Sequence, residues 1–140
     1  MSILGGTLND VLDEPISDLD NKDQHWSIHE SGGPITAFQP VALVNGLVVA
    51  ADRSIPAHCN RVIGIALNST AGPGGTIQVA TQGIVTNIGW TFTTGERLWV
   101  GLNGAIETTL PTSGFVNGIG HAIELTKMEI TLTRNSINRS

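Results

Sequence analysis

The sequence has one cysteine, no tyrosine and few charged residues, and each scarcity excludes a class of protein. Because Cys59 is alone, the chain forms no internal disulfide and provides no thiolate cage for a metal ion. Charged residues make up 14% of the chain, against about a quarter in an average protein. No lysine and arginine cluster is available for a phosphate backbone, so we expect no direct nucleic-acid partner.

Long apolar runs are also missing. No segment approaches the roughly 18 consecutive apolar residues of a membrane span, and the first residues lack the basic and apolar regions of a secretion signal. We therefore expect a protein made in the cytoplasm with no membrane partner. A chain of 140 residues can bury one core without disulfides, so its stability is expected to come from packing or from partner subunits.

Charge divides the chain into two parts. Residues 1–30 hold seven acids and one lysine, whereas residues 31–140 hold five acids and six bases, so the net charge of −5 comes from the first part. We interpret residues 1–30 as an N-terminal arm and residues 31–140 as a β domain.

Apolar residues occur between the acids of the arm at spacings of three to four. They are Ile3, Leu4, Leu8, Val11, Leu12, Ile16 and Leu19. Thr7 and Asp10 form a weak capping box, which predicts a helix of one or two turns over about 8–13, ended by Pro15. Such a short helix is marginal alone in water. Two interpretations stay open: a disordered acidic tail, or a segment that becomes ordered on a partner.

From Ile35 onward, short β-branched runs alternate with turn residues. Asn45-Gly46 and Asn103-Gly104 each separate two apolar runs and predict hairpins with two-residue turns. About ten short strands, spaced by frequent turns, indicate an all-β fold, either a small β-barrel or a sandwich. The two hairpins, together with Gly64-Ile65 and Gly118-Ile119, hint at two related halves. A fold of so many strands has edge strands with unpaired backbone groups, which closure of the sheet or oligomerisation would cover.

The pair His58-Cys59 raises the question of a nucleophile beside its base. Neighbours in a strand point to opposite faces, so adjacency argues against this pairing, and a distant partner, His121, lies in an ordinary alternating run. We therefore expect Cys59 to be a small buried thiol without a catalytic role.

Other patterns fall short of a metal or catalytic site. His25-x-x-x-His29 lacks the glutamate of zinc hydrolases, so a solvated turn is expected there. Residues 18–23 resemble the start of a calcium loop but fail at three ligand or turn positions. The Gly-rich residues 71–75 lack a phosphate-loop ending, and no carboxylate pair for glycoside hydrolysis is evident. We expect no catalytic residues, no metal, no cofactor and no enzymatic activity.

Four segments of the β region resemble bacteriophage capsid decoration (cement) and head-fibre proteins, and some tail-fibre modules. In chain order they read "RVIGIAL", "VATQGIV", "GLNGAI" and "PTSGFVNGIG". The resemblance implies a virion component on the capsid exterior, synthesised in the host cytoplasm. It also implies a β-barrel or sandwich, the major capsid protein as partner and a homotrimer. In this light residues 53–60 are a loop that connects two strands, and the resemblance provides no catalytic residues.

Within this family we expect the arm to bind the capsid and stabilise it between its subunits. Its apolar residues, with Trp26 added, would enter grooves, while its acids would face basic capsid residues. Four aromatic residues are assigned to the oligomer interface: Trp90, Phe92, Trp99 and Phe115.

The alternative is a tail- or head-fibre module whose tryptophans stack on host surface glycan. Against it, Trp90 and Trp99 fall in the strand-like runs "IGWTFT" and "RLWVGL", where aromatic residues usually fill a core or a subunit interface. A Cys-His hydrolase is the third candidate.

Overall fold

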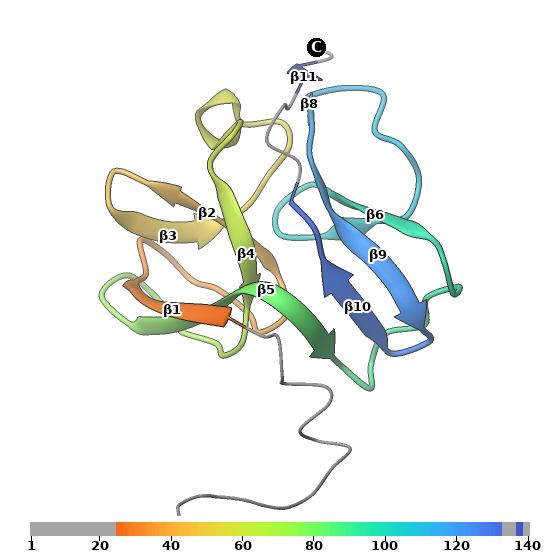
Figure 1. Cartoon of the computed structure of the whole chain (residues 1–140). Helices are drawn as coiled ribbons and strands as arrows, with labels where there is room; N and C mark the ends of the chain where they lie inside the picture. Colours follow the sequence, from red (N-terminus) through yellow and green to blue (C-terminus); the bar gives the residue numbers. More distant parts are fainter. Residues whose placement is uncertain (1–24, 133–136, 139–140) are drawn as a thin grey trace, which may run out of the picture.

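The computed structural model describes residues 25–132 and 137–138 (Figure 1). These residues form strands and one 3₁₀ turn, η1 (Pro56–His58), and contain no α-helix, so none that could cross a membrane. The strands are β1 (His25–Glu30), β2 (Pro40–Val44), β3 (Leu47–Ala50), β4 (Val62–Ala66), β5 (Thr76–Thr86), β6 (Arg97–Val100), β7 (Ile106–Glu107), β8 (Phe115–Val116), β9 (Gly118–Glu124), β10 (Lys127–Ile130) and β11 (Ile137–Asn138). The predicted all-β fold is confirmed.

Nine strands form one open sheet in which paired strands are antiparallel. Its order is β3-β2-β4-β5-β10-β9-β6-β7, and β1 pairs with β5 beside this path. β8 and β11 form a separate pair. Figure 1 shows β1 to β4 on one side and β6 and β9 on the other, with β5 beside β10 between them. The sheet ends at β3 and β7, so it is one open sheet, whereas the sequence predicted a small β-barrel or a sandwich.

The strand order contains the same four-strand unit twice, in opposite directions. β3-β2-β4-β5 in the first half corresponds to β7-β6-β9-β10 in the second, and β5 pairs with β10 where the halves meet. Both hairpins turn at Asn-Gly, and Asn45, Gly46, Asn103 and Gly104 have φ between 51° and 82°. These values suit a two-residue hairpin turn. The two related halves are therefore present, although the glycine equivalent to Gly64 is Gly120 and not Gly118 as the sequence pattern suggested.

The hydrogen bonds that lead into β2 and β6 are the same in both halves. Phe38 N donates to Ala66 O at 2.6 Å, and Gly95 N donates to Ala122 O at 2.7 Å. Each alanine N–H donates in return to the carbonyl of the residue after Phe38 or Gly95, at 2.9 and 2.8 Å. Phe38 and Gly95 therefore occupy equivalent positions.

Each half also brings a glycine close to the backbone of a neighbouring strand. A Cβ added to Gly64 would overlap the carbonyl oxygen of Ala80, and one added to Gly120 would overlap that of Glu129. Only glycine fits where the neighbouring backbone leaves no room for a methyl group. This explains the glycines that interrupt the apolar runs of β4 and β9.

The core consists of two clusters of buried apolar residues. The larger cluster joins both halves and includes Ile65, Leu98, Phe115 and Met128. The smaller one belongs to the first half: Ile35, Val41, Val48, Ala66, Ile77 and Val79. β5 contributes to both clusters, so this long strand connects the two parts of the core.

The predicted boundary at residue 30 falls after β1. Residues 25–30 form this strand, so the sheet includes the last part of the predicted arm. The predicted helix over residues 8–13, the calcium-like residues 18–23 and the seven apolar residues from Ile3 to Leu19 lie outside the described residues.

Candidate functional site

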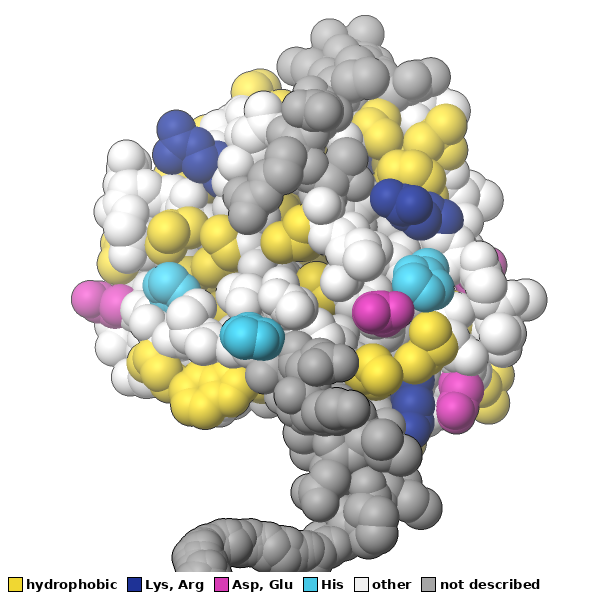
Figure 2. Space-filling view, viewed as in Figure 1, with side chains coloured by type: hydrophobic (Ala, Val, Ile, Leu, Met, Phe, Trp, Pro, Cys, Tyr) yellow, Lys and Arg dark blue, Asp and Glu magenta, His cyan; other side chains and the backbone are white. Residues whose placement is uncertain are grey.

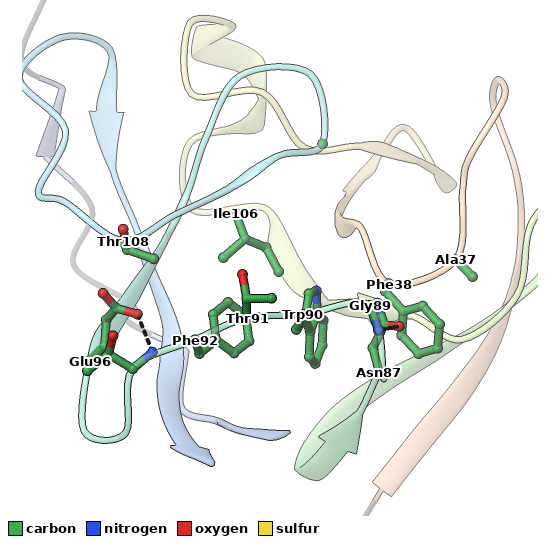
Figure 3. A pocket seen from close by; sticks show the side chains of 12 residues that line it. Ala37, Phe38, Asn87, Gly89, Trp90, Thr91, Phe92, Glu96, Ile106 and Thr108 are labelled. Carbon is green, nitrogen blue, oxygen red and sulfur yellow. Dashed lines mark hydrogen bonds between the residues drawn. The ribbon is translucent and has the colours of Figure 1, made fainter. Parts of the chain in front are cut away.

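An open groove of about 530 Å³ lies between the loop before β2, the loop that joins β5 to β6, and β7 (Figure 3). Its described lining combines three aromatic rings with polar side chains. The aromatic residues are Phe38, Trp90 and Phe92, and the polar ones include Asn87, Thr91, Glu96 and Thr108. The volume is within the roughly 300–1,000 Å³ usual for small-molecule sites.

The three rings stand in a row, with Trp90 between the two phenylalanines (Figure 3). The centroids of Trp90 and Phe92 are 4.9 Å apart, and those of Phe38 and Trp90 are 5.7 Å apart with an edge-to-face angle of 71°. Such separations are typical of favourable aromatic pairs. All three rings are half-buried and pack against the larger core cluster, which holds the row in place.

The backbone of Phe38 is strained. Its φ is 73°, and the other described non-glycine residues with positive φ are asparagines, which tolerate this conformation. For other residues the left-handed region costs about 1–2 kcal/mol. The equivalent residue of the second half is Gly95, with φ of 89°. Because strained residues cluster at functional sites, Phe38 identifies the groove as the candidate site.

Local turns position the polar side chains. Glu96 Oε1 accepts a hydrogen bond from Thr93 N at 3.0 Å, and Asn87 Oδ1 accepts one from Gly89 N at 3.0 Å. Glu96 is the only charged side chain among the described residues that line the groove. The site therefore offers aromatic surface, hydroxyl and amide groups, and one carboxylate.

The prediction that Trp90 lies in a strand is wrong. Residues 87–96 form a loop because Asn87 closes a turn, with Trp90 N donating to Asn87 O at 3.0 Å, and Phe92 N then donates to Leu125 O at 2.8 Å. The sequence reasoning therefore missed the groove. The Asn87 and Gly89 pair was the signal that could have revealed this turn.

The other predicted interface residues lie in two environments. Phe115 is 1% exposed and belongs to the larger core cluster of the chain itself. Trp99 is half-buried on β6, and the Arg97 guanidinium lies 5.4 Å from its ring centroid. The oligomer-interface role of these residues, and of Trp90 and Phe92, stays a prediction.

A second candidate surface lies on β1. Trp26 and Ile28 are 53% and 56% exposed, and both point from the same face of the strand because they are two residues apart. They lie opposite Ala80 and Gln78 of β5. Exposed apolar side chains and histidines appear on the face shown in Figure 2. The binding role predicted for Trp26 stays a prediction, and Ile28 is exposed beside it.

The predicted solvated turn around His25 and His29 is wrong, because both residues lie in β1. Backbone pairing with β5 over residues 76–82 stabilises this strand. Ser27 Oγ lies 2.7 Å from His29 Nε2. Among the described residues, no group of three histidine, cysteine or acidic side chains is placed to hold a metal ion.

The predicted loop over residues 53–60 is confirmed, since it connects β3 to β4. His58 is 6% exposed, and its Nδ1 accepts a hydrogen bond from Asp52 N at 3.0 Å. Burial lowers the pKa of His58, and the Asp52 carboxylate opposes this shift. Cys59 packs partly buried against the larger core cluster. Both residues therefore serve the packing of the loop.

Arg53 joins this loop to the second half. Its Nε and Nη2 donate to the two carboxylate oxygens of Glu107 at 3.0 and 3.3 Å. Its Nη1 donates to the carbonyl and hydroxyl oxygens of Ser113 at 2.8 and 3.0 Å. This arrangement is a structural connection between the halves.

Comparison with family models and with curated proteins finds no match. Among solved structures, the chain is similar to one described as "The crystal structure of head fiber gp8.5 N base in bacteriophage phi29". The TM-score is 0.48 with 18% sequence identity, over 82% of this chain and 98% of that chain. A likeness at this level does not establish a shared function.

Proposed function

We propose that this protein is a non-enzymatic structural component of a bacteriophage head, attached to the outer capsid surface through its N-terminal arm and β1. The class follows from the four segments that resemble decoration and head-fibre proteins. The observation that supports the attachment surface is the exposure of Trp26 and Ile28, at 53% and 56%, on β1, which forms the last part of the predicted arm.

The physical basis is burial of apolar side chains at the junctions between capsid subunits. Each buried Leu, Ile or Trp would contribute about 1.5–3 kcal/mol, while ordering the arm would cost about 1–2 kcal/mol per residue. A single chain is therefore expected to bind the capsid weakly. A homotrimer, which we also propose, combines three such contacts and holds far more strongly.

A component that binds only the assembled shell stabilises it by mass action. The main form of the proposal is therefore a decoration protein that strengthens the capsid between its subunits. The alternative form is a fibre module, anchored to the head in the same way, that also contacts the host. The aromatic groove is the feature that favours this alternative.

The attachment is tested by co-sedimentation of the full chain with undecorated heads. Two double variants, Leu8→Asp with Leu12→Asp and Trp26→Ser with Ile28→Ser, should each weaken binding by tenfold or more, because each removes roughly 3 kcal/mol of burial. Neutralising Asp18 and Asp20 should matter less, since exposed ion pairs contribute little.

The control variant is Ile88→Ser, because Ile88 is 91% exposed and lies away from the arm and β1 in the chain. It should bind heads like the unchanged protein. Full head occupancy by both double variants would overturn the proposed attachment. Sedimentation of the free protein should give three times the chain mass of 14.7 kDa, and a monomer at micromolar concentration would contradict the trimer.

A further inference from the structure

We propose that the groove lined by Phe38, Trp90 and Phe92 is a binding site for a neutral saccharide unit of one or two rings. This inference rests on the groove itself and does not require attachment to a capsid. The second half has Gly95 at the position equivalent to Phe38, so the backbone of this position does not require a ring.

The shape of the groove suits a sugar. A pyranose ring has an apolar C–H face and a periphery of hydroxyl groups. The row of three rings, with centroids 4.9 and 5.7 Å apart, offers apolar surface to the C–H face. Polar side chains beside the row can contact the hydroxyl groups (Figure 3). The exposed lining of the groove is mainly polar around the aromatic row, which suits a ligand rich in hydroxyl groups.

The hydrogen-bonding groups fit hydroxyl ligands. The indole N–H of Trp90 has no partner among the described residues, and the same holds for the hydroxyls of Thr91 and Thr108. Glu96 has one oxygen bound by Thr93 N, which leaves its second oxygen as an acceptor. Hydroxyl groups both donate and accept, so a sugar can satisfy this mixture of donors and acceptors.

The charge of the groove lining favours a neutral ligand. Glu96 provides the only charge among the described lining residues, and no cation lines the groove with it. A phosphorylated or acidic ligand would therefore meet like charge with no compensating partner. The same argument disfavours the chain's own arm, because residues 1–24 hold six acids and one lysine.

The strain of Phe38 supports a role for its ring. At the equivalent position Gly95 shows that the fold itself needs only a left-handed residue. The phenylalanine costs about 1–2 kcal/mol of backbone strain there. In return it extends the aromatic row beyond Trp90, which is the surface that a sugar face would cover.

A second hollow shows that volume alone does not make the site. It measures about 580 Å³ and lies beside Ile35, Thr36, Gln39 and Thr70, and none of its described lining residues is aromatic. It has hydroxyl and amide groups like the first groove. We therefore expect binding only where the aromatic rings are.

The test uses the full chain labelled with ¹⁵N, whose three tryptophans, Trp26, Trp90 and Trp99, give three separate indole N–H signals. The probes are neutral mono- and disaccharides of glucose, galactose, mannose and their N-acetylamines, with glucuronic acid as the charged counterpart. The Trp90 signal should shift saturably with at least one neutral probe, and glucuronic acid should shift it less. Signals of Trp26 and Trp99 should stay in place.

Variants assign the contacts. Trp90→Phe keeps a ring but removes the indole donor, so the affinity, followed in this variant by the backbone N–H signals of the groove residues, should fall about tenfold. The matched control Trp99→Phe should bind unchanged. Thr108→Val alters an exposed residue beside the groove, so it should keep the fold and weaken binding even if Trp90→Phe fails to fold.

Three results would overturn the site: no Trp90 shift with any probe in the panel, equal affinity of Thr108→Val and the unchanged protein, or tighter binding of glucuronic acid than of its neutral counterpart. Because these measurements contain no capsid, their failure is distinct from failure of the proposed attachment to heads.

Discussion

Phe38 and Gly95 occupy equivalent positions in the two halves of the sheet, and both have positive φ, at 73° and 89°. Each N–H donates to the carbonyl of an alanine, Ala66 or Ala122, in a neighbouring strand. Glycine adopts this conformation freely, whereas a residue with a Cβ does not. The pair therefore separates what the fold requires, a left-handed residue, from what the first half adds, a ring in the groove.

The strain at Phe38 predicts an inverted order of stability for two variants. Both Phe38→Gly and Phe38→Ala lose the ring, but only glycine relieves the strain, so Phe38→Gly should be about 1 kcal/mol more stable than Phe38→Ala. Urea unfolding measures the difference. At Phe92, whose φ is not positive, the order should be the usual one, with alanine more stable. The same order at both sites would contradict the strain.

The close strand contacts predict a large effect of one methyl group. Gly64→Ala and Gly120→Ala should each lower the free energy of unfolding by about 2 kcal/mol or more, because the Cβ would overlap a backbone carbonyl that cannot move aside. Gly72→Ala is the matched control, since nothing lies within 4 Å of its added Cβ. Thermal unfolding of the three variants checks this, and a small effect at both Gly64 and Gly120 would show that the strands can separate there.

Arg53 connects the two halves, so we expect Arg53→Lys to lower the free energy of unfolding by about 1–3 kcal/mol. Lysine keeps the charge but cannot make the paired hydrogen bonds to Glu107. The Arg53 and Glu107 side chains are 14% and 27% exposed, so solvent only partly screens the pair. The more exposed pair of His121 and Glu129, at 3.6 Å, is the control. Glu129→Gln should change stability little, as is usual for surface pairs. Equal losses of stability in Arg53→Lys and Glu129→Gln, measured by chemical unfolding, would contradict the proposed role of Arg53 in connecting the halves.

Burial of His58 predicts a loss of stability toward acid. Burial lowers its pKa in the folded state, although the Asp52 carboxylate opposes the shift. The unfolded chain then takes up the proton more readily, so this contribution is fully present above the unfolded pKa of about 6.5 and is lost as pH falls through the folded pKa.

The measurement is the free energy of unfolding between about pH 8 and pH 5. His58→Gln keeps an acceptor near Asp52 N but cannot titrate, so its stability should depend less on pH over this range. The other histidines are the same in both proteins, so the comparison isolates His58. An identical pH dependence would contradict a buried, neutral His58.

Short-range chemistry made much of the fold predictable. The Asn-Gly pairs force left-handed turns, so both hairpins followed from the sequence. The β-branched runs gave most of the strands that lie between residues 40 and 130. The relation of the two halves was visible as a hint in the repeated Asn-Gly hairpins, although the glycine that matches Gly64 is Gly120 and not Gly118.

Trp90 and β1 could not be assigned in the same way. The run around Trp90 alternates like a strand, but no strand pairs with it. The turn closed by Asn87 makes this segment a loop. Residues 25–30 have weak strand signals, and pairing with β5 makes them a strand. The outcome for β1 therefore depends on a segment distant in the sequence, whereas at Trp90 the local turn at Asn87 decides it.

The sequence by itself determined the all-β class, the turns, the glycines and the uneven charge, because each follows from local backbone preference or from composition. Only the tertiary structure decided the order of the strands, the row of Phe38, Trp90 and Phe92, and the exposure of Trp26 and Ile28. Those features arise from packing between segments up to about fifty residues apart, such as Phe38 against Trp90, and the identity of a distant partner is not encoded in the spacing of neighbouring residues.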